Sequence, residues 1–221
     1  MNGKTRTQVE KTHYGIQYDS PGRFISYYHQ IRSVMEKQPK NILEIGIGNK
    51  TVSNYLKERG MSVTTCDFDA TLEPDVVADI RSLPFRDEMF DLVTAFEVLE
   101  HLPFKDFKTS LLEMKRVTRE RIIVSIPYVT LNIFGKIKLL PLIKPIYFLW
   151  RIVEYRLSEH KFDNQHYWEM GKKGYSRNII RKEIKSVGLE IEKESTPQLN
   201  PYHYFFVLKK PSQAARYSAP N

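Results

Sequence analysis

Two glycines lie in the segment Ile42–Lys50, ILEIGIGNK, where an apolar run gives way to polar residues. A residue without a β-carbon lets the backbone turn sharply and approach a ligand closely, so Gly46 and Gly48 favour a ligand-binding turn. Asp67 follows about twenty residues later, the spacing at which a carboxylate accepts hydrogen bonds from the hydroxyls of a ribose. A further acid, Asp79, can accept from an adenine amino group. The spacing therefore indicates a site for an adenosine-bearing ligand.

A second group of residues could move protons. Glu97, Glu100 and His101 stand in FDLVTAFEVLEHLP, and His160 and His166 stand in EHKFDNQHYWE. Carboxylates and imidazoles can take the proton from an acceptor hydroxyl, or they can bind a divalent ion. We expect Glu97, His101 and His166 to be catalytic. The alternative is a metal site formed by Glu97, Glu100 and His101, with a histidine from the second segment.

Aromatic residues near the end of the second segment suit a sugar or an aromatic acceptor. We expect His160, Tyr167 and Trp168 to border this acceptor. Tyr167 and Trp168 could instead anchor the surrounding chain in the core, because large aromatic side chains contribute most to core packing. Both interpretations stay open from the sequence.

Short runs rich in Val and Ile alternate with helical patterns, which predicts βαβ units and a parallel sheet buried on both faces. Ser20 and Pro21 form a helix start, and Gly60 and Gly188 form helix ends. We expect helices over about 20–37, 51–59, 104–117 and 176–187. We expect strands over about 41–45, 62–66, 76–78, 90–96, 121–125, 189–194 and 204–209, the last of them antiparallel.

Residues 41 to about 126 resemble the class I S-adenosylmethionine-dependent methyltransferases, in particular the broad group with an E-x-G-x-G-x-G turn and an EVLEHL segment. A dinucleotide dehydrogenase would instead place glycine at position 51, which is Thr51 here. The resemblance implies a Rossmann-like three-layer α/β fold with a seven-stranded, mostly parallel sheet and an antiparallel last strand. It also implies S-adenosylmethionine as cofactor, held by Glu44, Gly46, Ile47, Gly48, Asp67, Phe68, Asp79, Ile80 and Phe96.

The chain departs from this family at Lys50, where a third glycine is usual. Asn49 precedes it, and asparagine tolerates left-handed conformations and caps helices well. We therefore expect the turn to survive, with Lys50 adding charge near the cofactor carboxylate. Tyr14, Tyr18 and Arg23 belong to an N-terminal segment that is expected to fold over the cofactor.

Charge divides the chain into a neutral front and a basic back. Residues 1–127 hold 18 basic and 18 acidic residues, whereas residues 128–221 hold 16 basic and 8 acidic ones. The back half includes LNIFGKIKLLPLIKPIYFLWRIVEYRL, which is too apolar for a solvated loop. We consider three roles for it: a lid over the acceptor, contact with an anionic membrane through residues 131–156, as an interfacial helix would make it, and a dimer contact.

These patterns predict one methyltransferase domain over 1–211, with an N-terminal cap at 1–38, the insertion at 128–172 and a disordered tail at 212–221. The expected reaction is methyl transfer to a small-molecule, sugar or lipid-linked hydroxyl. The alternatives are an RNA 2′-O-methyltransferase with an E-x-x-E-H metal site and a non-catalytic cofactor-binding regulator. The single cysteine, Cys66, fits a core role and a cytoplasmic protein, with membrane association possible through the insertion.

Overall fold

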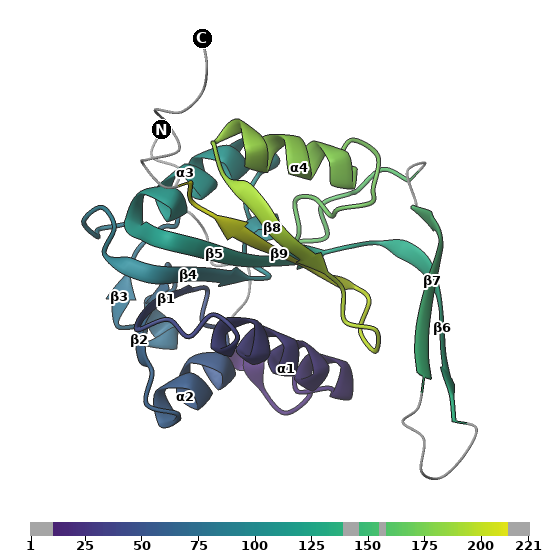
Figure 1. The fold of residues 1–221 in the computed structure, drawn as a ribbon, viewed down its shortest axis with the longest axis horizontal. Helices are drawn as coiled ribbons and strands as arrows, with labels where there is room; N and C mark the ends of the chain where they lie inside the picture. Colours follow the sequence, from purple (N-terminus) through teal and green to yellow (C-terminus); the bar gives the residue numbers. More distant parts are fainter. Residues whose placement is uncertain (1–10, 139–145, 155–157, 212–221) are drawn as a thin grey trace.

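The computed structural model describes residues 11–138, 146–154 and 158–211. The expected tail at 212–221 and the first ten residues of the expected cap lie outside the described residues. Seven strands form one sheet in the order β3-β2-β1-β4-β5-β9-β8 (Figure 1). The first five in chain order are parallel, and the last, β9 (His203–Lys209), is antiparallel to both of its neighbours. The predicted sheet and its antiparallel last strand are confirmed.

The other strands of this sheet follow the apolar runs of the sequence closely. Their bounds are β1 (Asn41–Ile45), β2 (Ser62–Asp67), β3 (Val76–Val77), β4 (Phe90–Phe96), β5 (Thr118–Pro127) and β8 (Glu190–Ser195). Strand β5 extends beyond the expected range at both ends. At its C-terminal end it gains residues because β9 pairs with it as far as Pro127, and at its N-terminal end Thr118 pairs with Phe90 of β4.

Two helices cover each face of the sheet (Figure 1). On one face lie α1 (Pro21–Met35) and α2 (Thr51–Glu58), and on the other lie α3 (Phe107–Val117) and α4 (Arg177–Ser186). The serines Ser20 and Ser176 cap α1 and α4 by accepting from Arg23 and Ile179 backbone N–H groups. Each helix pair encloses its own apolar cluster against the buried strands, which makes the three layers expected from the sequence.

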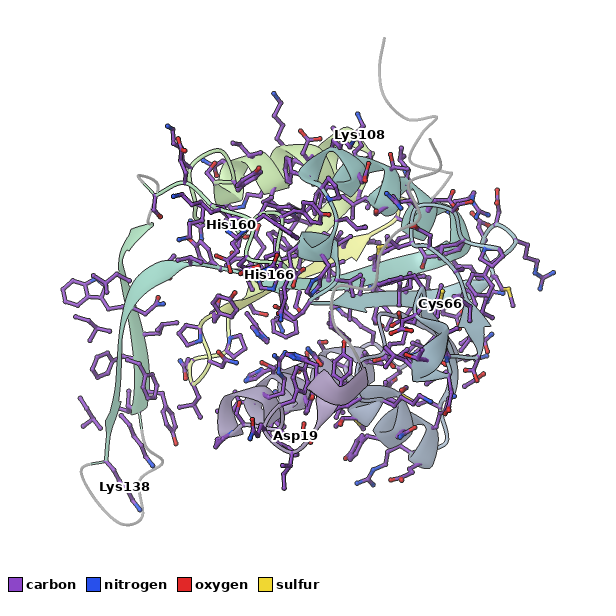
Figure 2. The ribbon with its side chains drawn as sticks, turned by 180° about the vertical axis from the view of Figure 1, so that it is seen from behind. Asp19, Cys66, Lys108, Lys138, His160 and His166 are labelled. Carbon is purple, nitrogen blue, oxygen red and sulfur yellow. The ribbon has the colours of Figure 1, made fainter. Side chains whose placement is uncertain are left out.

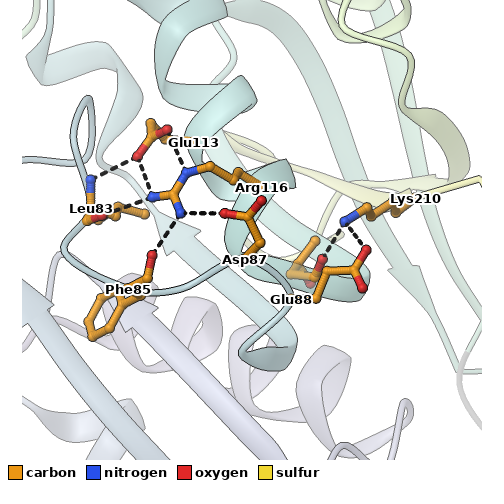
Figure 3. Close-up of polar contacts among 8 residues, drawn as sticks. Leu83, Phe85, Asp87, Glu88, Glu113, Arg116 and Lys210 are labelled. Atoms are coloured by element: carbon orange, nitrogen blue, oxygen red, sulfur yellow. Dashed lines mark hydrogen bonds and ion pairs between the residues drawn. The ribbon is translucent and has the colours of Figure 1, made fainter.

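The loop between β3 and β4 is held by one arginine of α3 (Figure 3). Arg116 donates to both carboxylate oxygens of Glu113, to the carbonyls of Leu83 and Phe85, and to Asp87, at 2.7–2.9 Å. Glu113 in turn accepts from the Leu83 N–H. Because a guanidinium offers five donors in a fixed plane, a single side chain fixes the start of this loop.

The insertion after β5 is an antiparallel hairpin, β6 (Thr130–Ile137) and β7 (Ile146–Glu154). It forms a separate two-stranded sheet that stands apart from the body in Figure 1. The comparison with an interfacial helix was therefore wrong in its secondary structure. The β-branched and aromatic residues of the insertion favour strands, and its prolines fall between the two strands. No helix among the described residues is both long enough and apolar enough to cross a bilayer.

Candidate active site

A cavity of about 210 Å³ lies at the carboxyl ends of β1, β2 and β4. This is the edge at which open α/β sheets usually bind ligands. All nine residues expected to bind the cofactor line it, and so do the three expected catalytic residues. Tyr14, Tyr18 and Arg23 line it from the N-terminal segment, and the Arg23 guanidinium lies 4.2 Å from the Tyr18 ring centre. The sequence patterns thus converge on one space.

The glycine turn closes one wall of this cavity. Gly46 has φ +78°, and a β-carbon there would lie 2.2 Å from a methyl group of Val98. Gly48 has φ +49° and lies against the Tyr14 ring. Both glycines are therefore required by backbone conformation, and Gly46 also by the close approach of a neighbouring side chain.

The third position of the turn differs from the expectation for Asn49 and Lys50. Lys50, not Asn49, takes the left-handed conformation, with φ +62°. Asn49 accepts from the Thr51 N–H and donates to Asp19. The Lys50 ammonium donates to the carbonyl of Glu73, and Lys50 does not line the cavity. The turn keeps the shape that a glycine would give it, and the lysine charge is directed elsewhere.

Asp67 closes β2 and supports the turn directly. Its two carboxylate oxygens accept from the backbone N–H groups of Ile47 and Asp69, each at 2.9 Å. Burial raises the pKa of Asp67, and these two hydrogen bonds act against that rise. Each carboxylate oxygen has two acceptor positions, so hydroxyls of a ribose can still be accommodated.

The residues expected around an adenine have different environments. Phe68 is exposed by 42%, whereas Ile80 is buried. The Asp79 carboxylate accepts from Arg81 through both oxygens, at 2.6–3.1 Å, and Arg81 also pairs with Asp106. Asp79 thus already holds a cation, so its part in adenine binding stays a prediction.

Glu44 is a buried acid in the floor of the cavity. It is 4% exposed, and one carboxylate oxygen has no hydrogen-bond partner among the described residues. Burial raises the pKa of Glu44 to about 8, although Ser53 and Lys57 act in the opposite direction. The floor therefore favours a neutral acid until a cationic or hydrogen-donating ligand arrives.

Two more acids follow β4 and line the cavity. Glu97 has φ +55°, and one of its oxygens is buried without a partner among the described residues. Glu100 is fully buried, and neither of its carboxylate oxygens has a hydrogen-bond partner among the described residues. Burial, and next the charge of Glu97, raise the pKa of Glu100 well above its ordinary value. Such orphaned oxygens need a donor or a cation from a ligand.

Two histidine rings meet beside these acids. The rings of His101 and His166 lie 5.0 Å apart between centres. Burial lowers the pKa of His101 to about 4, so its imidazole is neutral near neutral pH. A carboxylate at Glu169 lies 3.1 Å from Nδ1 of His166 and also accepts from the Tyr202 hydroxyl at 2.6 Å.

The ionisation state of Glu169 fixes the tautomer of His166. Burial raises the pKa of Glu169, but hydrogen bonds from His166 and Tyr202 bring it below its ordinary value. An ionised carboxylate can only accept, so Nδ1 of His166 carries the hydrogen. The other ring nitrogen, Nε2, is then a base when the ring is neutral.

Sequence patterns missed one side-chain pair of the cavity. Nδ1 of His203 lies 2.6 Å from the Ser26 hydroxyl, and Nε2 lies 3.5 Å from Glu97. Burial lowers the pKa of His203. Ser26 belongs to α1 and His203 to β9, so no local spacing in the sequence connects them.

Residues 43–124 match the family model described as a methyltransferase domain. This part of the chain is thereby identified as a methyltransferase domain. Its fold is shared with solved structures over most of their length. No curated protein sequence matches the chain.

Three of these structures illustrate the range of that fold. The 1,6-didemethyltoxoflavin-N1-methyltransferase of Burkholderia thailandensis is 13% identical, with coverage of 91% of this chain and 85% of that one and a TM-score of 0.58. The magnesium protoporphyrin IX methyltransferase of Synechocystis is 14% identical, with coverage of 93% and 90% and a TM-score of 0.59. A methyltransferase of Clostridium acetobutylicum is 12% identical, with coverage of 90% and 96% and a TM-score of 0.57. At these identities the likeness establishes the fold.

The methyltransferase cavity excludes the three residues expected to border the acceptor. Trp168 is fully buried, donates to the Leu102 carbonyl, and packs against Phe104 and Phe107. Its position is that of a core anchor. Tyr167 is exposed by 39%, and Nε2 of His160 donates to the carbonyl of His166 at 2.8 Å, but neither residue lines the cavity. Figure 2 shows His160 and His166 close together in the body of the methyltransferase.

Cys66 also has the structural role expected of it. It is fully buried in β2, and burial raises the pKa of its thiol to about 12. A thiol in this state is a small core residue and a poor nucleophile.

Proposed function

We propose that this methyltransferase transfers a methyl group from S-adenosylmethionine to a hydroxyl of a small-molecule, sugar or lipid-linked acceptor. One observation carries the proposal: a single cavity is lined by the glycine turn, Asp67 and two histidines. His101 is neutral, and His166 is oriented by its hydrogen bond to Glu169. The first set suits an adenosine-bearing donor, and the second suits a proton acceptor. Magnesium protoporphyrin IX methyltransferase was crystallised with the donor or with its demethylated product, which supports the choice of donor.

The residues present fit the proposed donor. S-adenosylmethionine supplies an electrophilic methyl group on a positively charged sulfur. Asp67 would hold the ribose, the turn at 46–48 would allow close approach of the backbone, and Glu44 would meet the positive end of the methionine portion. Arg23 is the one arginine or lysine among the described residues that line the cavity, so it would face the donor carboxylate.

His166 would act on the acceptor. Methyl transfer is an in-line displacement, so the enzyme's main task is to align the nucleophile with the methyl group. The bound donor would supply the methyl group, and Nε2 of His166 would take the proton from the acceptor hydroxyl. Glu169 stabilises the imidazolium that results, as an orienting carboxylate does in hydrolase triads.

Isothermal titration with S-adenosylhomocysteine tests the donor half. We expect the wild type to bind and Asp67→Ala to lose affinity by at least about tenfold. The substitution removes a carboxylate that accepts two backbone hydrogen bonds and would accept from the ribose hydroxyls. Asp87→Ala is the matched control, since its carboxylate is largely exposed and lies outside the cavity. Equal binding by all three proteins contradicts the donor assignment.

Labelled donor and a panel of hydroxyl acceptors test the acceptor half. With an acceptor found, His166→Asn is expected to lower kcat by about a hundredfold or more while donor binding stays intact. Unchanged kcat in this variant shows that His166 is not the base. Donor binding without transfer to any acceptor would instead support the regulatory alternative.

A metal-dependent RNA 2′-O-methyltransferase is the second candidate, and one observation favours it. Donor atoms of Glu100, His101 and His166 all lie within 4.8 Å of one another. Two imidazoles and a carboxylate suit Mn²⁺, Fe²⁺ or Zn²⁺. Glu97, which was expected among the ligands, is outside this cluster, and His166 takes its place. A bound ion would supply Lewis-acid activation of the acceptor hydroxyl.

Titration with Mn²⁺ tests this candidate without any acceptor. Binding that is abolished by Glu100→Gln but kept in Glu97→Gln supports the cluster. Transfer that is insensitive both to chelation and to Glu100→Gln removes it.

A further inference from the structure

The hairpin formed by β6 and β7 contributes no residue to the cavity of the active site. Its two strands make their main contacts with each other and few with other elements. Figure 2 shows it standing apart from the body, with side chains on both faces and Lys138 at its far end. A two-stranded sheet has no core of its own, so apolar side chains on it remain exposed.

Cross-strand pairing defines one wholly apolar face. Residues that are directly opposite in an antiparallel pair point to the same side of the sheet. Ile133 pairs with Trp150, Gly135 with Phe148, and Ile137 with Ile146. We call the side chains of Ile133, Ile137, Ile146, Phe148 and Trp150 the apolar face. All five are exposed, Trp150 by 69% and Ile146 by 60%.

Gly135 makes this face flat and closely packed. A β-carbon at Gly135 would lie 2.1 Å from the Phe148 ring, so the ring lies directly over the backbone of the opposite strand. The glycine thus allows an aromatic ring to spread across the sheet.

The opposite face is mixed. Phe134 and Tyr147 stack with their ring centres 6.3 Å apart, and the Lys136 ammonium lies 5.6 Å from the centre of the Tyr147 ring. Lys138 follows β6 and is exposed. Along the sequence 130–154 there are four basic residues and one acidic residue, Glu154. The hairpin is therefore both apolar and cationic.

We propose that the hairpin docks the protein on an anionic lipid bilayer, with the apolar face entering the headgroup region and the lysines meeting lipid phosphates. Apolar side chains with an exposed tryptophan and flanking lysines are the composition that binds such interfaces. A second copy fits less well, because it would bring two sets of four cations together with only one acid, Glu154, in the sequence of each hairpin to offset them. A lid over the cavity would need contacts with the body that the strands make only sparsely.

The hairpin also lies where a bilayer could present an acceptor. β5 ends at Pro127, on the edge of the sheet where the cavity opens, and β6 begins at Thr130. The short link is fixed to the body, since Tyr128 donates to the Tyr202 carbonyl and Val129 to the Met170 carbonyl. Docking does not depend on methyl transfer, so its test stands apart from that of the proposed function.

Vesicle co-sedimentation of the full chain tests the proposal. We expect binding to phosphatidylcholine vesicles that contain phosphatidylglycerol, and weakening of that binding by salt. Ile133→Ser with Trp150→Ser should weaken binding at least about tenfold, because exposed apolar area is lost. Lys136→Glu with Lys138→Glu should weaken it by at least about tenfold through charge. Both pairs are exposed, so folding should be kept, as circular dichroism would verify.

Matched controls come from α3. Leu112→Ser removes an exposed apolar side chain and Lys108→Glu reverses an exposed charge, both outside the hairpin. Figure 2 shows Lys108 far from Lys138. These variants should bind vesicles as the wild type does. Loss of binding in the controls as large as in the hairpin variants overturns the proposal.

Tryptophan emission gives a second readout. Trp150 is exposed and Trp168 is fully buried, so a shift of emission to shorter wavelength on adding anionic vesicles reports Trp150. The shift should disappear in Trp150→Phe. Absence of binding to anionic vesicles, equal binding to pure phosphatidylcholine, or a hairpin-dependent dimer in sedimentation velocity without vesicle binding each overturns the proposal.

Discussion

Replacing Glu44 by glutamine should make the protein without its cofactor more stable at high pH relative to the wild type. Glu44 is buried under the glycine turn, and burial raises its pKa to about 8 from an ordinary 4.5. In the unfolded chain this carboxyl ionises near its ordinary pKa. Between the two values the folded state binds the extra proton, so stability falls as pH rises through this window.

The size of the effect follows from the shift. One pKa unit corresponds to about 1.4 kcal/mol, so the full shift of Glu44 is an upper limit of about 5 kcal/mol above pH 8 and roughly 3 kcal/mol at pH 7. Below pH 5 the carboxyl is protonated in the folded state, and glutamine is nearly isosteric with it. The variant should therefore gain on the wild type steadily from pH 5 to pH 8.

Urea unfolding of both proteins at pH 5, 6, 7 and 8 measures this directly. The change in their stability difference with pH is the relevant quantity, because any fixed cost of the amide cancels. A difference that stays flat over this range refutes the raised pKa.

S-adenosylmethionine should bind Glu44→Gln more weakly. Its binding to the wild type at pH 7 should release a proton, seen as a dependence of the titration enthalpy on the buffer's ionisation enthalpy.

Three shorter predictions follow from other contacts. Gly46→Ala should abolish binding of S-adenosylhomocysteine by titration, because its β-carbon would meet Val98 and its φ is +78°; retained binding would show that the turn adapts. Arg116→Met should lower the free energy of unfolding by about 2 kcal/mol in urea, since it removes the donors to the Leu83 and Phe85 carbonyls, and an unchanged midpoint would contradict that. Tyr202→Phe should lower kcat and shift its pH profile, since the hydrogen bond to Glu169 is lost; an unchanged profile would remove Glu169 from the mechanism.

The positions of the residues proposed to hold the donor were predictable because these residues lie at strand ends. Asp67 and the glycine turn are placed by β1 and β2, whose apolar runs show clearly in the sequence. Parallel strands bring their carboxyl ends to one edge, so position along the chain was enough. The exact conformation at Lys50 was not predictable, because a left-handed lysine depends on the turn around it and not on residue preference.

The acceptor side and the hairpin depended on distant contacts. The pairing of Ser26 with His203 joins residues 177 positions apart, which no local spacing reveals. Trp168 could border a ligand or fill a core, and only the packing against Phe104 and Phe107 decides for the core. The insertion is apolar on one face and mixed on the other, so the period-two pattern of a strand is obscured in its sequence.

The position of charge makes a final prediction about the acceptor. The basic excess of residues 128–221 suggested an anionic partner, but the described residues of that half that line the cavity include no lysine or arginine. Instead, Glu97 and Glu100 line the cavity together with His166, and one oxygen of Glu97 and both oxygens of Glu100 lack hydrogen-bond partners among the described residues. A phosphate close to the reacting hydroxyl would meet the Glu97 carboxylate without a lysine or arginine from this half to offset it, and like charges at short range in a buried site repel strongly.

Neutral acceptors should therefore be preferred at the reacting atom. In a matched pair, an acceptor with a phosphate next to its reacting hydroxyl should show a lower kcat/KM, by about tenfold or more, than the same acceptor without it. Glu97→Gln should reduce this difference in kcat/KM between the two acceptors, because it removes one negative charge from the cavity and leaves the phosphate of the acceptor unchanged. A preference for the phosphorylated member, kept in Glu97→Gln, would place the anion-binding function in the cavity itself and not on the basic hairpin.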